Sequence, residues 1–195
     1  MTITADQVKK LRDQTGVGMM EAKKALDEAE GDMQKAIEVL RKAGQKIADK
    51  KQDRTAAEGV IGTYVHANNK VAAMVVLNCE TDFVARTDDF KNLAHDIAMQ
   101  VAATKPEYLN PDEIPADVIE KEKQIASEQS DVAGKPDKVV AKIIEGKLQK
   151  FYSEICLLQQ PFIKDDSVTI EQLVQDAVTN MGENIQIREF TYISI

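Results

Sequence analysis

The sequence predicts an α+β protein, in which a small helical unit precedes a core that combines an antiparallel sheet with helices. Apolar residues recur at helical spacing in short segments before residue 44 and again after residue 88. Between residues 59 and 79, and again in the last residues of the chain, apolar residues recur at every second position instead. Helices and strands that fall in separate groups are typical of this class.

Residues 1–44 are predicted to form a compact unit of three short helices. Thr4 and Gln7 can form a capping box at the start of the first helix, in which the side chain of each residue hydrogen-bonds the backbone of the other. The second helix is expected from about Met19 to Ala29 and the third from Met33 to Ala43, because apolar residues recur along one face of each. Helices this short must pack together to be stable.

Gly44 is expected to end the third helix, and the polar, basic residues 45–58 are expected to form a linker that is partly helical. Residues 59–195 are then predicted to form the core. Within it, Ala67-Asn68-Asn69-Lys70 indicates a hairpin turn, since asparagine tolerates positive φ. Apolar residues alternate on both sides of this turn: Ile61 and Val65 with Thr63 before it, and Val71, Ala73, Val75, Leu77 and Cys79 after it.

A helix is expected after the hairpin, capped by Thr81 or Thr87 and packed against the inner face of the hairpin. The stripe that this helix buries is predicted to consist of Phe90, Leu93, Ala94, Ile97 and Val101. Two further helices, from about residue 116 to residue 158, are predicted to form a protruding antiparallel hairpin, because Gly134-Lys135-Pro136 separates them.

The last helix is predicted to end at Gly182, and a terminal strand is expected to complete a three-stranded antiparallel sheet. The large side chains of that strand fall on both faces: Ile185 and Ile187 share one face, and further along Phe190 and Tyr192 occupy one face and Ile193 and Ile195 the other. A strand that is apolar on both sides predicts a sheet that is covered on its second face. A second copy of so short a chain can supply the cover, so a homodimer is expected.

The composition indicates a globular, non-secreted protein, and a cytoplasmic location is expected. Of the 195 residues, 43% are hydrophobic and 30% are charged. The 25 basic and 33 acidic residues give a net charge of -8, which argues against a sequence-independent grip on nucleic acid. Cys79 and Cys156 are far apart in apolar surroundings, as expected of reduced core thiols. The longest clean apolar run, Ala72–Leu77, is far too short to cross a bilayer.

The sequence lacks the patterns of an enzyme active site. Neither of the glycine-rich motifs that cradle phosphates is present, and the two histidines, His66 and His95, do not form a zinc-binding pattern. Cys156 lies within the apolar stripe of a helix, where an inert packed thiol is expected. The prediction is a protein that is not an enzyme and that binds no cofactor or metal of its own.

One candidate contact site lies at the start of the second helix. Met19 and Met20 follow Gly16-Val17-Gly18, and at most one of them can point squarely inward. The other is a candidate contact, because methionine adapts to a partner surface. Lys23 and Lys24 form a small basic cluster, which is more typical of a solvated helix face.

A second candidate site is Asp82-Phe83, at the junction between a strand and a helix. Functional residues often collect at such junctions, because the flanking elements hold them in position. Spacing alone nevertheless favours a structural role, with Phe83 packed under the helix and Asp82 stabilising its positive end.

Four blocks of sequence together resemble the elongation factor Ts family. They are LRDQTGVGMMEAKKAL (Leu11–Leu26), AAEG (Ala56–Gly59), NCETDFVAR (Asn78–Arg86) and QPFIKD (Gln160–Asp165). The resemblance is specific because the blocks occur in the family's order, from Leu11 to about Arg188. It implies the short form of the family, with a single core subdomain. Many members are longer and carry a second copy of that subdomain, and short members are expected to dimerise.

The resemblance implies an exchange factor that binds elongation factor Tu, a GTPase of protein synthesis, and speeds the release of its GDP. It also implies that the N-terminal helices are similar to a ubiquitin-associated (UBA-like) fold and contact the nucleotide-binding domain of the partner. The candidate contacts on this module are Arg12, Met19, Met20 and Lys23.

In the family, the T-D-F-V loop enters the same domain of the partner beside its magnesium site. The resemblance therefore implies that Thr81, Asp82, Phe83 and Val84 dislocate Mg²⁺ in the partner GTPase. An alternative from another class is a non-exchanging adaptor, whose three-helix module binds ubiquitin-like folds or ribosomal components while the core only dimerises. The complete T-D-F-V block would then lack a purpose, which favours exchange.

Overall fold

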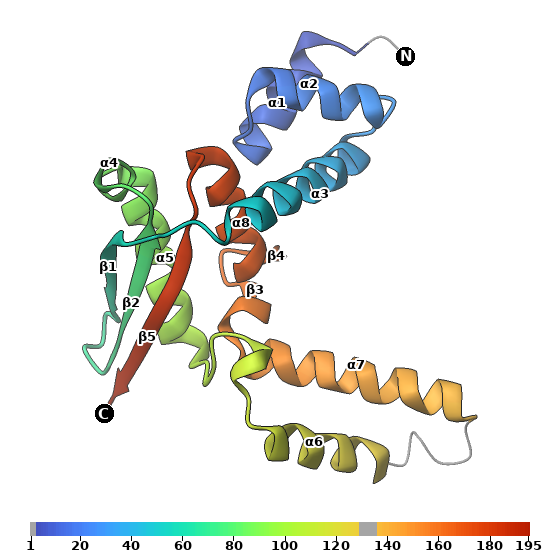
Figure 1. Cartoon of the computed structure of the whole chain (residues 1–195), viewed down its shortest axis with the longest axis vertical. Coiled ribbons are helices and arrows are strands. Elements are labelled where there is room, and N and C mark those ends of the chain that lie inside the picture. The colour runs from blue at the N-terminus through green and yellow to red at the C-terminus, as the bar shows by residue number, and fades with distance from the viewer. Residues whose placement is uncertain (1–2, 129–135) are drawn as a thin grey trace. The chain divides into compact units, whose positions relative to one another are not determined.

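Figure 1 shows the computed structural model of the chain, which describes residues 3–128 and 136–195. The chain folds into two compact units and passes between them more than once. One unit comprises Met1–Val60, Leu77–Asn92 and Gln172–Arg188, and the other comprises Ile61–Val76, Leu93–Glu171 and Glu189–Ile195.

Three helices at the N-terminus pack around a small apolar core, as predicted. They are α1 (Ala5–Thr15), α2 (Met19–Glu28) and α3 (Met33–Lys51). The predicted capping box is present, because the Thr4 hydroxyl accepts the Gln7 N–H at 3.3 Å and the Gln7 side-chain oxygen accepts the Thr4 N–H at 2.9 Å. The buried side chains of this core are small or branched: Val8, Leu11, Ala22, Ala25, Leu26, Ala29 and Ala36.

Gly44 does not end α3, so this part of the prediction is wrong. The helix continues to Lys51 and takes in the first half of the segment expected to be a linker. Gly44 is buried, and a Cβ atom at this position would lie 3.2 Å from the hydroxyl oxygen of Thr179. The glycine therefore serves close packing in the middle of a helix.

The main sheet has three strands in the order β1-β2-β5, which confirms the predicted hairpin and terminal strand. The strands are β1 (Glu58–Val65), β2 (Val71–Cys79) and β5 (Gln186–Ser194), and they lie side by side in Figure 1. In the turn between β1 and β2, Asn69 has a φ of 54°, and the His66 N–H donates to the Val71 carbonyl at 2.8 Å.

The third strand, β5, runs antiparallel to β2. At one end of β2, the Ile195 N–H donates to the Lys70 carbonyl at 3.1 Å. At the other end, the Asn184 N–H donates to the Glu80 carboxylate at 2.6 Å. The end of β5 is thus beside the start of β2, and the start of β5 is beside the end of β2.

Two helices follow β2 where one was predicted. Thr81 caps the single turn α4 (Asp82–Ala85), and Thr87 precedes the long helix α5 (Asp88–Thr104), where its hydroxyl accepts the Phe90 N–H at 3.3 Å. Both threonines that were considered as caps are therefore used. The predicted stripe of α5 is buried: Phe90, Leu93, Ala94, Ile97 and Val101.

One face of the sheet, the inner face, lies against α5. A Cβ atom at Gly62 of β1 would lie 2.3 Å from the Ala94 carbonyl oxygen of α5. On β2, the inner side chains alternate along the strand and are buried: Ala73, Val75, Leu77 and Cys79. Ile61 and Val65 therefore lie on the opposite, outer face, where both are exposed.

The side chains of β5 confirm one predicted face. Ile185 and Ile187 are buried. Further along, the Lys105 ammonium lies 5.1 Å from the centre of the Tyr192 ring. Ile193, the next residue of the strand, and Ile195 are both exposed.

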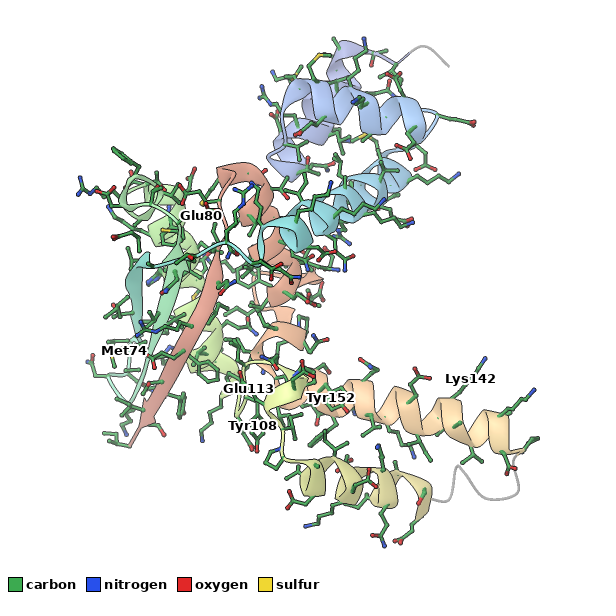
Figure 2. All side chains as sticks on the ribbon, in the orientation of Figure 1. Met74, Glu80, Tyr108, Glu113, Lys142 and Tyr152 are labelled. Carbon is green, nitrogen blue, oxygen red and sulfur yellow. The ribbon has the colours of Figure 1, made fainter. Side chains whose placement is uncertain are left out.

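Two helices, α6 (Ala116–Glu128) and α7 (Asp137–Ile155), lie side by side and run in opposite directions, which confirms the predicted helical pair (Figure 1). Residues 129–135, which include Gly134 and Lys135 of the predicted turn, lie outside the described residues. Tyr108 and Tyr152 lie together at the base of the pair (Figure 2). There the Leu157 N–H donates to the Tyr108 carbonyl at 2.9 Å.

A small second sheet was not predicted. Its strands β3 (Pro161–Phe162) and β4 (Asp165–Thr169) are antiparallel and lead into α8 (Ile170–Met181), which Gly182 ends with a φ of 76°, as predicted. Two buried glutamines join this sheet to α5. The Gln100 amide nitrogen donates to the Gln160 side-chain oxygen at 3.1 Å, and the Gln100 side-chain oxygen accepts the Ile163 N–H at 2.9 Å.

None of the helices in residues 3–128 and 136–195 combines the length and the apolar character that a bilayer crossing requires. The two longest, α3 and α7, have 19 residues each but carry several charged side chains.

Candidate functional site

The segment Thr81–Val84 forms most of a one-turn helix between β2 and α5. The Thr81 backbone is extended, with φ −128° and ψ 154°, and its hydroxyl accepts the Val84 N–H at 3.4 Å. Two backbone hydrogen bonds close the turn, from the Ala85 N–H to the Thr81 carbonyl at 3.3 Å and from the Arg86 N–H to the Asp82 carbonyl at 3.1 Å. A single turn has little stability of its own, so its conformation depends on the groups around it.

Phe83 projects into solvent from this turn. Its side chain is 78% exposed, whereas Ala85 in the same turn is buried. The interpretation that spacing alone favoured, with Phe83 packed under the helix, is wrong. An aromatic ring buries about 150–250 Å² when it is covered, so a ring left exposed on a positioned loop is typical of a contact site.

Asp82 lies beside the ring and is paired within the same turn. Its carboxylate oxygen Oδ2 is 2.7 Å from Nη2 of Arg86, and the side chains of Asp82 and Arg86 are 44% and 77% exposed. An exposed ion pair of this kind contributes only about 0–1 kcal/mol. Asp82 can therefore exchange Arg86 for groups of a partner at low cost.

Glu183 holds Thr81 from outside the segment. One carboxylate oxygen accepts the Glu80 N–H at 3.1 Å and the Thr81 N–H at 3.0 Å, and the other accepts the Thr81 hydroxyl at 2.6 Å. The buried Cys79 thiol donates to the Thr81 carbonyl at 3.2 Å. Burial raises the pKa of Cys79, and the charge of Glu183 adds to the rise, so the thiol keeps its proton at neutral pH.

Glu80 ties the same loop to two other parts of the chain. Its carboxylate accepts the Asn184 N–H at 2.6 Å and lies 3.5 Å from the Arg54 guanidinium. Figure 2 labels Glu80 where the end of β2 meets the turn between α8 and β5. The buried Asn184 amide donates to the carbonyls of Gln52 at 3.2 Å and Arg54 at 2.7 Å. The loop after β2 is therefore fixed by segments that are distant in sequence.

Sequence reasoning missed Glu183 and Glu80. Glu183 is 102 residues from Thr81 along the chain, and a single sequence carries no signal for a contact at that separation. The one local hint is that Glu183 directly follows Gly182, which ends a helix in a left-handed conformation and so turns the chain sharply.

The candidate contacts of the N-terminal module lie on the surface of α1 and α2. Met19 is 44% exposed and Met20 is 75% exposed, so neither points squarely inward. Lys23 is also exposed, and its spacing from Met19 places both on one side of α2. Arg12, near the end of α1, is held by Asp13 with Nε 3.0 Å from Oδ1. The two methionines and the two basic side chains are all accessible to a partner.

Cys156 and the two histidines, His66 and His95, have structural surroundings. Burial raises the pKa of Cys156 to about 11, and a thiol that keeps its proton at neutral pH is a poor nucleophile. Nδ1 of His95 is 2.9 Å from the Thr63 carbonyl oxygen, and Nδ1 of His66 is 3.1 Å from the Tyr64 hydroxyl. Both histidines thus support the packing of β1.

Comparison with known proteins shows similarity along nearly the whole chain. A family model described as elongation factor TS matches residues 3–179. Elongation factor Ts of Acetivibrio thermocellus is 54% identical over 188 residues, which cover 96% of this chain and 87% of that protein. Elongation factor Ts of Fervidobacterium nodosum is 54% identical over 195 residues, which cover 100% of this chain and 99% of that protein. Elongation factor Ts of Herpetosiphon aurantiacus is 51% identical over 195 residues, which cover 100% of this chain and 98% of that protein.

The family model and the match to the Fervidobacterium nodosum protein both cover the N-terminal module and the loop that carries Phe83. The proteins of this family act on a partner GTPase and are not catalytic enzymes, which agrees with a site built from an exposed ring on a supported turn. The chain belongs to the elongation factor Ts family, the nucleotide exchange factors of elongation factor Tu in translation elongation.

Proposed function

We propose that this chain promotes GDP release from elongation factor Tu by inserting Thr81–Val84 beside the site where the partner holds Mg²⁺. The observation that carries this proposal is Phe83, whose side chain is 78% exposed on a turn that hydrogen bonds hold in place. A ring on a firm base can displace segments of a partner, whereas a ring on a loose loop would move aside.

The proposed action follows from thermodynamic linkage. A protein that weakens GDP binding to the partner must itself bind the GDP-loaded partner more weakly, by the same factor. Phe83 supplies apolar area that is covered only in the inserted state. Asp82 competes for the groups that organise the metal ion. Because Mg²⁺ bridges phosphate and protein, its dislocation removes a large favourable charge interaction from bound GDP.

The N-terminal module is proposed to bind the nucleotide-binding domain of the partner and so deliver the loop. Its exposed contacts are Met19 and Met20, with Arg12 and Lys23 beside them. Methionine side chains adapt to the shape of a partner surface, and basic side chains suit an acidic one. We propose that this occurs in the cytoplasm, where translation elongation takes place.

Release of a fluorescent GDP analogue from elongation factor Tu tests the proposal. In excess unlabelled GDP, the release rate is expected to rise with the concentration of this chain and then saturate. With EDTA in place of Mg²⁺, the intrinsic release is already fast, so the acceleration by this chain is expected to shrink. Equal acceleration in Mg²⁺ and in EDTA would reject dislocation of the ion, and no acceleration in either buffer would favour the adaptor alternative.

We also propose that two copies associate through the outer face of the main sheet. The exposed apolar side chains of this face are Ile61 and Val65 on β1 and Met74 on β2. Ile193 of β5 and Ile195 just after it are exposed as well. Soluble monomers rarely expose apolar patches larger than a few hundred Å². A second copy presents the same face, so a two-fold arrangement would cover both patches at once.

The substitution Met74→Lys tests this association. Met74, on the central strand β2, is 44% exposed, and Figure 2 labels it. A lysine there would place two charges in an apolar interface, so light scattering is expected to show dimers for the natural chain and monomers for Met74→Lys. The matched control is Ile125→Lys, at a residue of α6 that is 42% exposed and should leave the dimer intact. A monomeric natural chain at micromolar concentration would contradict the proposal.

A further inference from the structure

We infer that Glu183 is a positioning residue for nucleotide exchange, which sets the orientation of the turn that carries Phe83. This inference rests on the proposed insertion of Thr81–Val84 into the partner. Glu183 reaches the turn through three hydrogen bonds to Glu80 and Thr81, as given above. It does not belong to the inserted segment and acts through Thr81.

Glu183 acts on the turn itself through its contact with the Thr81 hydroxyl. A hydroxyl has one proton to donate, and here it goes to Glu183 at 2.6 Å. The oxygen of the same hydroxyl is then left to accept the Val84 N–H at 3.4 Å, which caps α4. Glu183 thus fixes the rotation of the hydroxyl that holds both ends of the segment Thr81–Val84.

Glu183 is itself firmly anchored. It lies between Gly182, whose left-handed backbone ends α8, and Asn184, which is buried. The Asn184 side chain donates to the carbonyls of Gln52 and Arg54, and its N–H donates to Glu80. The carboxylate therefore comes from a turn that has its own supports, and those supports do not include Phe83.

Loss of the carboxylate should affect insertion of the loop into the partner more than the initial binding of the partner. In Glu183→Gln, the NH₂ group can only donate, so either the backbone N–H groups of Glu80 and Thr81 lose their acceptor, or the Thr81 hydroxyl must accept from Gln instead of donating to it. In the second case the hydroxyl no longer has the orientation in which it caps Val84. The freed turn samples more orientations, and the ring must be ordered again before it inserts. The methionines of the N-terminal module, which are proposed to bind the partner, are untouched by this change. The maximal release rate should therefore fall while the half-saturating concentration stays nearly the same.

The test measures release of a fluorescent GDP analogue from elongation factor Tu against the concentration of each variant. Glu183→Gln is expected to lower the maximal rate about tenfold. Thr81→Val, which removes only the hydroxyl, is expected to lower it as well and serves if Glu183→Gln does not fold. Glu145→Gln makes the same chemical change on the exposed surface of α7 and should leave the rate unchanged. Thermal unfolding of each variant shows whether its fold is intact.

A double-mutant cycle with Phe83→Ala separates positioning from other roles. If Glu183 acts through the ring, then Glu183→Gln should cost little further in a chain that already carries Phe83→Ala. If the losses from the two substitutions multiply in the double variant, the inference is overturned. It is also overturned if Glu183→Gln alone releases GDP at the natural rate while Phe83→Ala alone releases it slowly. A natural rate for Phe83→Ala would instead overturn the proposed insertion itself.

Discussion

Phe83→Ala is expected to slow GDP release from elongation factor Tu about thirtyfold at saturating protein. Covering most of a phenylalanine ring stabilises the inserted state by about 2 kcal/mol, which corresponds to roughly this factor if it is fully coupled to release. The ring is 78% exposed in the free protein, so its removal should cost that protein little stability. Stopped-flow fluorescence of a labelled GDP measures the release rate directly.

Two further variants test whether the slower release comes from the lost apolar area at position 83. Phe83→Leu keeps much of the apolar area and should give an intermediate rate. Ile125→Ala removes an exposed apolar side chain from α6, away from the loop, and should release GDP at the natural rate. An unchanged rate for Phe83→Ala at saturating protein would reject the proposed role of the ring.

Gly62→Ala is expected to lower the free energy of unfolding by about 3 kcal/mol or more. A Cβ atom at this position would lie 2.3 Å from the carbonyl oxygen and 2.4 Å from the carbonyl carbon of Ala94. These are backbone atoms of α5, which cannot rotate away as the end of a flexible side chain can. The methyl group would force α5 away from β1 and loosen the stripe that includes Ile97 and Val101. Unfolding in urea, followed by circular dichroism, measures the change.

Gly146→Ala is the matched control for this prediction. Gly146 lies within α7, and a Cβ atom there would meet nothing within 4 Å. Because alanine favours helix over glycine, the substitution should raise the free energy of unfolding by about 0.5–1 kcal/mol. Equal effects of the two substitutions would mean that α5 does not approach β1 as closely as the structure shows.

Much of the fold could be predicted because its signals are local. Thr4 and Gln7 are three residues apart, so their capping box can be read from the sequence and is found in the structure. The alternation from Val71 to Cys79 and the turn at Asn69 identify a hairpin within one short stretch. The stripe of α5 shows helical periodicity over several turns and is buried as predicted.

The predictions failed where a distant contact decides the outcome. Gly44 reads as a helix end, but its neighbour Thr179 comes from another helix and requires a small residue inside α3. The small sheet of β3 and β4 depends on buried amides, because Gln100 of α5 hydrogen-bonds both Gln160 and Ile163. No periodicity in the residues from 160 to 169 reveals that partner.

The candidate site was only half predictable for the same reason. Spacing alone favoured a buried Phe83, and only the resemblance pointed to an exposed one, which the structure confirms. Its support by Glu183 joins residues 102 positions apart, beyond any pattern within one sequence. The contacts assigned to Arg12, Met19 and the other exposed residues of the N-terminal module stay predictions.

The reciprocity of binding tests the proposed insertion most directly. Calorimetry can measure the affinity of this chain for elongation factor Tu both without nucleotide and with GDP bound. For the natural chain, GDP is expected to weaken the affinity strongly, and for Phe83→Ala the ratio of the two affinities is expected to fall by about thirtyfold. The same ratio for the natural chain and Phe83→Ala would contradict the claim that the ring couples this protein to GDP release.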